Sequence, residues 1–190
     1  PELVRWRGFL EKVKHPGNTV NIGLIGKYIE LQDAYKSILE SFIHAGAMND
    51  CKVQVINVHS EYINEENVAE KLIGLDGLLV APGFGFRGVD GKIHAVKYAR
   101  ENKLPFFGIC LGMQMAAIEF SRDILGIADA DSTEMNPETK DPVIDMMEEQ
   151  KKITMKGGTM RLGSYPCEIK ENTLAHTIYG STQINERHRH

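Results

Sequence analysis

The chain has 190 residues, of which 42% are hydrophobic and 25% are charged, and its formal net charge is -4 at pH 7. This length and apolar content suffice for one domain with a full core. The negative charge shows no nucleic-acid-binding footprint, and no apolar run reaches the roughly 18 residues that a membrane-spanning helix needs, so we expect neither a nucleic-acid nor a membrane partner.

Residues 1–18 mix charged and apolar side chains, which predicts a short helix that ends at the breaker His15-Pro16-Gly17. Both ends of the sequence look cut, because it starts at Pro1 without a methionine and stops at His190 inside a basic run. We therefore expect a piece of a longer protein, in which residues 1–18 lead in from an upstream domain.

Strand and helix patterns then alternate four times at short intervals. The predicted strands are 20–25, 52–58, 78–81 and 104–109, and the predicted helices are 33–45, stopped by Gly46, then 65–73, 92–101 and 112–120. This order predicts a doubly wound, mostly parallel α/β sheet with helices on both faces, whose chemistry lies at the carboxyl ends of the strands. Two glycine-rich loops, 82–88 and 108–112, fall there.

Residues 128–152 are acidic and weakly periodic, and we interpret them as a long surface excursion. Residues 153–169 predict strands and turns that return to the body of the domain. The three cysteines, Cys51, Cys110 and Cys167, are widely spaced, which indicates a reducing, cytoplasmic compartment and argues against a thiolate zinc site.

The strongest chemical signal is the segment 106–114, in which Gly108 and Gly112 each stand two residues from Cys110. A buried strand that turns into a helix at such a G-x-C-x-G corner has the pattern of a nucleophile elbow, where glycines avoid collisions in a tight turn. The helix N-terminus favours the Cys110 thiolate, and the N–H of Leu111 points at the oxygen of a tetrahedral adduct. The alternative is a buried structural cysteine.

The loop at 82–88 carries the pattern G-x-G-x-x-G, beginning at Gly83. A dinucleotide site is rejected, because that fingerprint follows the first strand and requires an acidic residue at the end of the next strand, which here ends in Ile109-Cys110. We expect the loop to adjoin the nucleophile, with the N–H of Gly83 as the second oxyanion donor. A plain glycine-rich turn is the alternative.

A thiolate nucleophile normally works with a histidine that a carboxylate orients. None of the seven histidines has a local acidic partner that marks it as the base. The run from Arg187 to His190 is either a phosphate or carboxylate site or a solvated basic tail. Glu134 has the charge to meet a substrate ammonium, although its spacing does not single it out.

Residues 107–114 resemble the nucleophile segment of the class I glutamine amidotransferases. The segments 20–35, 83–88, 157–163 and 186–190 resemble the glutaminase domains of the CTP synthase family. Several long motifs in one order are more specific than a single elbow, and the resemblance runs from about Trp6 to His190. It implies the flavodoxin-like fold of that family, with residues 19–190 as the amidotransferase domain and residues 1–18 as a linker helix from an absent N-terminal synthetase domain.

The resemblance implies a reaction in which Cys110 attacks the side-chain amide of glutamine and forms a glutamyl thioester. The ammonia passes to the synthetase domain of the same polypeptide, where ATP with Mg²⁺ phosphorylates UTP and the ammonia gives CTP, in pyrimidine nucleotide biosynthesis. GTP is the family's allosteric activator. The resemblance further implies a homotetrameric full-length enzyme, and we expect no cofactor or metal in this domain itself.

Seven residues join Cys110 in the site that the resemblance implies for glutamine and the oxyanion: Gly83, Phe84, Leu111, Gly112, Met113, Gln114 and Glu134. Gly83 and Leu111 are the implied oxyanion donors, and Phe84, Gln114 and Glu134 are the implied contacts of glutamine.

Two departures from the family follow. Its catalytic His and Glu lie in a His-Pro-Glu segment beyond the basic run, which this sequence does not reach, so we expect the isolated chain to be inactive. At Ala81-Pro82-Gly83 the family more often has Pro-Gly-Gly; since Pro82 has no N–H, Gly83 must donate.

Two other readings stay open. A different thiol hydrolase on the same architecture would normally have a histidine one or two residues after the nucleophile, where this chain has Leu111-Gly112. A non-catalytic binding or regulatory module that has lost its triad fits the missing His-Pro-Glu, but the intact Cys110 elbow argues against it.

Overall fold

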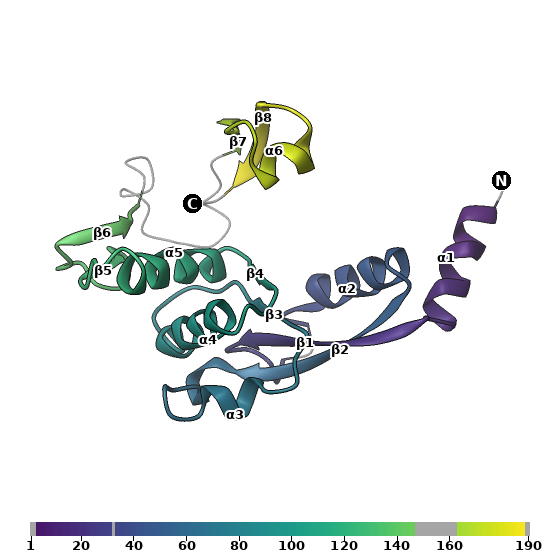
Figure 1. Ribbon diagram of the computed structural model, residues 1–190, viewed down its shortest axis with the longest axis horizontal. Helices are drawn as coiled ribbons and strands as arrows, with labels where there is room; N and C mark the ends of the chain where they lie inside the picture. The colour runs from purple at the N-terminus through teal and green to yellow at the C-terminus, as the bar shows by residue number, and fades with distance from the viewer. Residues whose placement is uncertain (1–2, 32, 147–162, 189–190) are drawn as a thin grey trace. The chain divides into compact units, whose positions relative to one another are not determined.

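The computed structural model describes residues 3–31, 33–146 and 163–188. Two compact units, residues 1–144 and 145–190, make up the chain (Figure 1). Among the described residues, no helix is long and apolar enough to cross a membrane. The motif at 157–162, together with Arg189 and His190, lies outside the described residues.

The first unit is built on a four-stranded parallel sheet with the order β2-β1-β3-β4. Its strands are β1 (Asn18–Gly26), β2 (Cys51–His59), β3 (Gly77–Val80) and β4 (Phe106–Gly108). β1 pairs along its whole length with β2, and from Ile22 to Ile25 with β3. The doubly wound order confirms the predicted fold class.

Five helices and one short 3₁₀ turn connect these strands or flank them: α1 (Val4–Lys14), α2 (Lys36–Met48), η1 (Ser60–Tyr62), α3 (Val68–Leu72), α4 (Val89–Glu101) and α5 (Leu111–Asp123). The prediction that Gly46 stops the second helix is wrong, because α2 continues to Met48. Gly46 instead permits close packing, since a Cβ there would lie 2.5 Å from the backbone oxygen of Cys51.

The sheet separates two apolar clusters, because alternate residues of a strand point to opposite faces. Leu24 and Leu79 pack on one face with partly buried side chains of α2. Ile25 and Val80, their neighbours in sequence, pack on the other face with buried residues of α4 and α5. Helices therefore cover both faces, and the first residue of α5 lies beside the end of β3.

Residues 128–152 are more than the surface excursion that their composition predicts. They contain β5 (Ala130–Ser132) and β6 (Asp141–Ile144), which pair in parallel and both contact α5. The pairing register shifts between Asp131 and Ser132. Periodicity does not reveal this small sheet, because its strands have only three and four residues.

The second unit contains the antiparallel pair β7 (Gly163–Glu168) and β8 (Gln183–His188), joined through α6 (Leu174–Tyr179). The hydroxyl of Thr173 accepts a hydrogen bond from the N–H of His176 at 3.2 Å and so caps α6. Arg187 and His188 belong to β8, where they pair with Ser164 and Gly163. The described part of the basic run is therefore a strand.

Two helical glycines give a test of this packing. Gly46→Ala should destabilise the protein by about 1–3 kcal/mol, because the new methyl group must displace the β2 backbone. Gly8→Ala is the matched control: nothing lies within 4 Å of a Cβ at Gly8, so helix propensity alone should stabilise α1 by about 0.8 kcal/mol. Hydrogen exchange of the α1, α2 and β2 amides measures both effects. Unchanged protection of the α2 and β2 amides in Gly46→Ala would contradict the close packing of Gly46 on Cys51.

Candidate functional site

Cys110 stands at the corner between β4 and α5, in a backbone conformation that side chains rarely adopt. Its φ is 55° and its ψ is -111°, and it is the N-cap residue of α5. A non-glycine residue in such a conformation carries about 1–3 kcal/mol of strain, which the surrounding structure must hold. The corner is the tight strand-to-helix turn that the spacing of Gly108 and Gly112 predicts.

Both flanking glycines are required sterically. A Cβ on Gly108 would lie 2.5 Å from the carbonyl carbon of Gly112, and a Cβ on Gly112 would lie 2.2 Å from the backbone oxygen of Val80. The N–H of Ile109 donates to the same Val80 oxygen at 3.1 Å. The segment around Cys110 therefore packs tightly against the carboxyl end of β3, where the loop with Gly83 begins.

The amides after Cys110 differ in their roles. The N–H of Gly112 donates to Ile109 at 2.9 Å, and those of Met113 and Gln114 donate to the Cys110 carbonyl, both at 3.1 Å. Leu111 is the first residue of α5, where a helix provides no acceptor for the amide. Its N–H has the position in the chain that an oxyanion donor needs, and the α5 dipole favours negative charge at this end.

Two buried lysines hold the backbone on either side of Gly83. Lys92 is fully buried and donates from Nζ to the carbonyl oxygen of Ala81 at 2.8 Å. Lys27 is 4% exposed and donates from Nζ to the carbonyl oxygen of Phe84. Both Nζ atoms lie within 4.0 Å of the point where a Cβ on Gly83 would stand. Two ammonium groups thus lie beside the Gly83 peptide.

These charges connect the Gly83 loop with Cys110. Burial, together with the charge of Lys27, lowers the pKa of Lys92 to about 8, and Cys110 acts in the opposite direction. A positive potential at this place favours a thiolate and a developing oxyanion. This buried charge could not be predicted from the sequence, because helical periodicity points to Ile93, Val96 and Ala99 as the inward side of α4.

The third glycine of the loop serves the packing of α4. Gly88 has a φ of 73° at the start of α4, and a Cβ there would lie 2.3 Å from Oγ of Ser60. Arg87 pairs with Glu61, with 3.0 Å between Nε and Oε1, so the loop is also tied to η1 through a side chain. The last glycine of the G-x-G-x-x-G pattern is therefore required by the close approach of η1.

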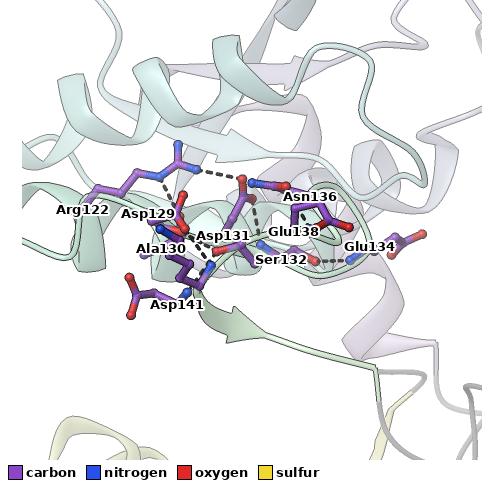
Figure 2. A network of polar contacts seen from close by, with 11 residues as sticks. Arg122, Asp129, Ala130, Asp131, Ser132, Glu134, Asn136, Glu138 and Asp141 are labelled. Carbon is purple, nitrogen blue, oxygen red and sulfur yellow. Dashed lines mark hydrogen bonds and ion pairs between the residues drawn. The ribbon is translucent and has the colours of Figure 1, made fainter.

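The remaining predicted residues lie on three neighbouring elements. Phe84, 43% exposed, follows β3, and Met113, 47% exposed, and half-buried Gln114 lie in the first turn of α5. Glu134 is half-buried on the turn between β5 and β6, where its N–H donates to Oγ of Ser132 at 3.2 Å (Figure 2). β3 pairs with β4, and both β3 and the small sheet contact α5, so these residues lie on or next to elements that contact one another.

The sequence does not reveal the pairing of His59 with Glu30. Nε2 of His59 lies 3.5 Å from Oε1 of Glu30, and Nδ1 accepts a hydrogen bond from the N–H of Glu61 at 3.4 Å. His59 ends β2, which β1 and β3 separate from β4, a lateral distance of roughly 14 Å. This pair is therefore too far across the sheet to act as the base for Cys110.

Metal binding finds no support in the described part of the chain, where no group of three His, Cys, Asp or Glu side chains could hold an ion.

Comparison with known proteins gives consistent results. The protein family Glutamine amidotransferase class-I matches residues 30–190. The chain is 67% identical over 190 residues to a CTP synthase of Flavobacterium johnsoniae, with 100% of this chain and 35% of that protein covered. It is 58% identical over 193 residues to a CTP synthase of Chlorobaculum tepidum, with 100% and 34% covered. The chain thus spans about a third of the length of these curated relatives.

A solved structure is similar as well. It is the glutaminase domain of Trypanosoma brucei CTPS with bound acivicin, with a TM-score of 0.78 and 37% sequence identity. The match covers 90% of this chain and 66% of that chain.

The low pKa of Lys92 predicts a pH dependence of stability. Because its pKa falls from 10.5 to about 8 on folding, the unfolded state binds more protons between these two values, and stability must rise with pH across that window, by up to about 3 kcal/mol. Denaturant unfolding of Cys110→Ala, which lacks the neighbouring thiol, should show this rise, and Lys92→Met in the same background should lose it. Exposed Lys36→Met is the control and should keep it; equal slopes for Lys92→Met and its parent would refute a buried lysine.

Proposed function

The chain belongs to the class I glutamine amidotransferases, and from that membership we propose that it is the glutamine-hydrolysing part of a CTP synthase. The observation that carries the proposal is Cys110 at the N-terminus of α5, with φ 55° and with the Gly83 loop alongside. Similarity to CTP synthases along the whole chain supports this choice within the family.

In the proposed reaction, the Cys110 thiolate attacks the side-chain carbonyl carbon of glutamine. The N–H groups of Gly83 and Leu111 bind the oxyanion of the tetrahedral adduct, and the charges of Lys27 and Lys92 stabilise it from behind the loop. The carbon–nitrogen bond then breaks, the nitrogen takes a proton and leaves as ammonia, and a glutamyl thioester remains. Water hydrolyses the thioester to glutamate and restores the thiol.

Recognition of glutamine is proposed for the side chains around this centre. Glu134 carries the negative charge that pairs with the substrate ammonium, and Phe84 and Gln114 contact the rest of the molecule. Gly112 and Met113 complete the wall of the site: Gly112 by letting α5 approach β3, and Met113 by its exposed side chain. The proton transfers need a histidine–glutamate pair, which the family has in a His-Pro-Glu segment that these 190 residues do not contain. We therefore propose that the isolated chain does not turn over glutamine.

The other half of the reaction is proposed for the part of the protein that this chain does not span. There, ATP with Mg²⁺ activates UTP, and the ammonia gives CTP. The full-length protein is proposed to be a cytoplasmic homotetramer that GTP activates. Residues 1–18, which contain α1, then lead from the synthetase domain into residues 19–190.

The test uses the full-length protein and compares two nitrogen sources. Cys110→Ala should abolish glutamine-dependent CTP formation, because no thioester can form, and should leave ammonia-dependent formation unchanged, because ammonia enters after this step. Treatment with the glutamine analogue 6-diazo-5-oxo-norleucine should give one adduct in the intact mass, and Cys110→Ala should remove it.

The other two cysteines provide matched controls for this test. Half-buried Cys51 and exposed Cys167 should be replaceable by alanine without loss of either activity or of the adduct. Glutamine-dependent synthesis that persists in Cys110→Ala, or an adduct on another residue, would exclude Cys110 as the nucleophile.

A further inference from the structure

Arg122, in the last turn of α5, makes two contacts with the small sheet. Its Nε donates to the carbonyl oxygen of Ala130 at 2.7 Å, and Nη2 lies 3.0 Å from Oδ2 of Asp131 (Figure 2). The side chains of Arg122 and Asp131 are 31% and 17% exposed, and Ala130 is fully buried. A planar guanidinium presents its donors in a fixed arrangement, so these contacts define both the distance and the direction of β5 relative to α5.

Asp131 transmits this contact along the chain. Its second carboxylate oxygen, Oδ1, accepts a hydrogen bond from the N–H of Ser132 at 2.8 Å, at the place where the register of β5 against β6 shifts. Such an irregularity directs the following side chain to a new position. Ser132 is 2% exposed, and its Oγ accepts the N–H of Glu134 at 3.2 Å. Three successive polar contacts therefore lead from Arg122 to the backbone of Glu134.

The turn is closed on the other side of Glu134 as well. The N–H groups of Met135 and Asn136 both donate to the Ser132 carbonyl, at 3.0 and 2.8 Å, and the N–H of Thr133 donates to Ile144 at 3.0 Å. Once Ser132 is placed, Glu134 therefore has little freedom. Met135 and Ile144 pack against the core cluster that contains Leu111 and Met115 of α5, so the turn packs against the helix that Cys110 caps.

We propose that Arg122 is a positioning residue for substrate recognition, which acts through Asp131 and Ser132 to place Glu134 against the ammonium group of glutamine. The inference rests on the proposed function, because it needs Glu134 to contact the substrate. Arg122 also brings a positive charge to Asp131, in a stretch of sequence that contains Asp129 and Glu134. One helix then positions the nucleophile at its first turn and the recognition residue at its last.

The test measures steady-state kinetics of the full-length protein with each nitrogen source. Arg122→Met should raise the KM for glutamine roughly 10- to 100-fold, because a recognition group displaced by about 1 Å loses most of its contact. Both kcat at saturating glutamine and ammonia-dependent synthesis should stay within about threefold of the wild type. Arg122→Lys should give an intermediate KM, since one ammonium cannot reproduce the fixed pair of donors.

A double-mutant cycle separates this role from general stabilisation. Asp131→Asn should also raise the KM, and combining it with Arg122→Met should add little, because both changes break the same contact. Lys97→Met is the matched control. Lys97, on α4, pairs with Asp123 in the last turn of α5 at 3.0 Å, and this ion pair does not involve the small sheet. It should leave the KM unchanged.

An Arg122→Met protein with a wild-type KM for glutamine overturns the inference. Loss of ammonia-dependent synthesis in Arg122→Met would instead show that this variant is misfolded. In that case Asp131→Asn provides the test, and an unchanged KM for glutamine in Asp131→Asn overturns the inference. A wild-type protein that uses ammonia but not glutamine contradicts the proposed function instead, and the two failures are thus distinguishable.

Discussion

The contact between the first turn of α5 and the carboxyl end of β3 determines the geometry of the whole site. A Cβ on Gly112 would lie 2.2 Å from the oxygen of Val80, so backbone lies directly on backbone there. At that separation the chain can leave β4 and enter the helix only through a sharp corner, and Cys110 takes the strained φ of 55°. The same contact fixes the axis of α5, and with it the position of every side chain that the helix carries.

The buried charges of the first unit have two kinds of partner, an opposite charge or a backbone carbonyl. Glu119, 1% exposed, accepts hydrogen bonds on Oε1 from Nε and Nη2 of Arg100 at 2.9 and 2.7 Å, an ion pair that joins α4 to α5. Lys27 and Lys92 instead bind backbone carbonyls, which carry no full charge. The cost of burying an ammonium is therefore less completely offset beside Gly83. The two ammonium groups therefore leave a positive potential beside Gly83, which can stabilise a thiolate and an oxyanion.

The sequence predicted best what depends on neighbouring residues. The strands followed from short β-branched runs, and the elbow at Cys110 followed from two glycines, because both are local steric effects. The packing role of Gly46 could not be predicted, since it depends on the close approach of Cys51, which belongs to another element. Burial of Lys92 leaves no trace in helical periodicity, because its partner is the carbonyl of Ala81, which lies outside α4, just after β3. Glu134 was singled out by resemblance alone, as its place depends on side-chain contacts across a loop.

The small sheet shows why Glu134, the proposed recognition residue, needs support from a helix. β5 has three residues and an irregular register, and a strand of that length holds its position poorly by ladder hydrogen bonds alone. Arg122 adds two contacts from a helix of 13 residues, one to backbone and one to a carboxylate. A site placed on a rigid element keeps its geometry better than one placed on a loop. Through Arg122, the turn that bears Glu134 gains the rigidity of α5, so one helix sets the distance between the Cys110 sulfur and the proposed recognition group.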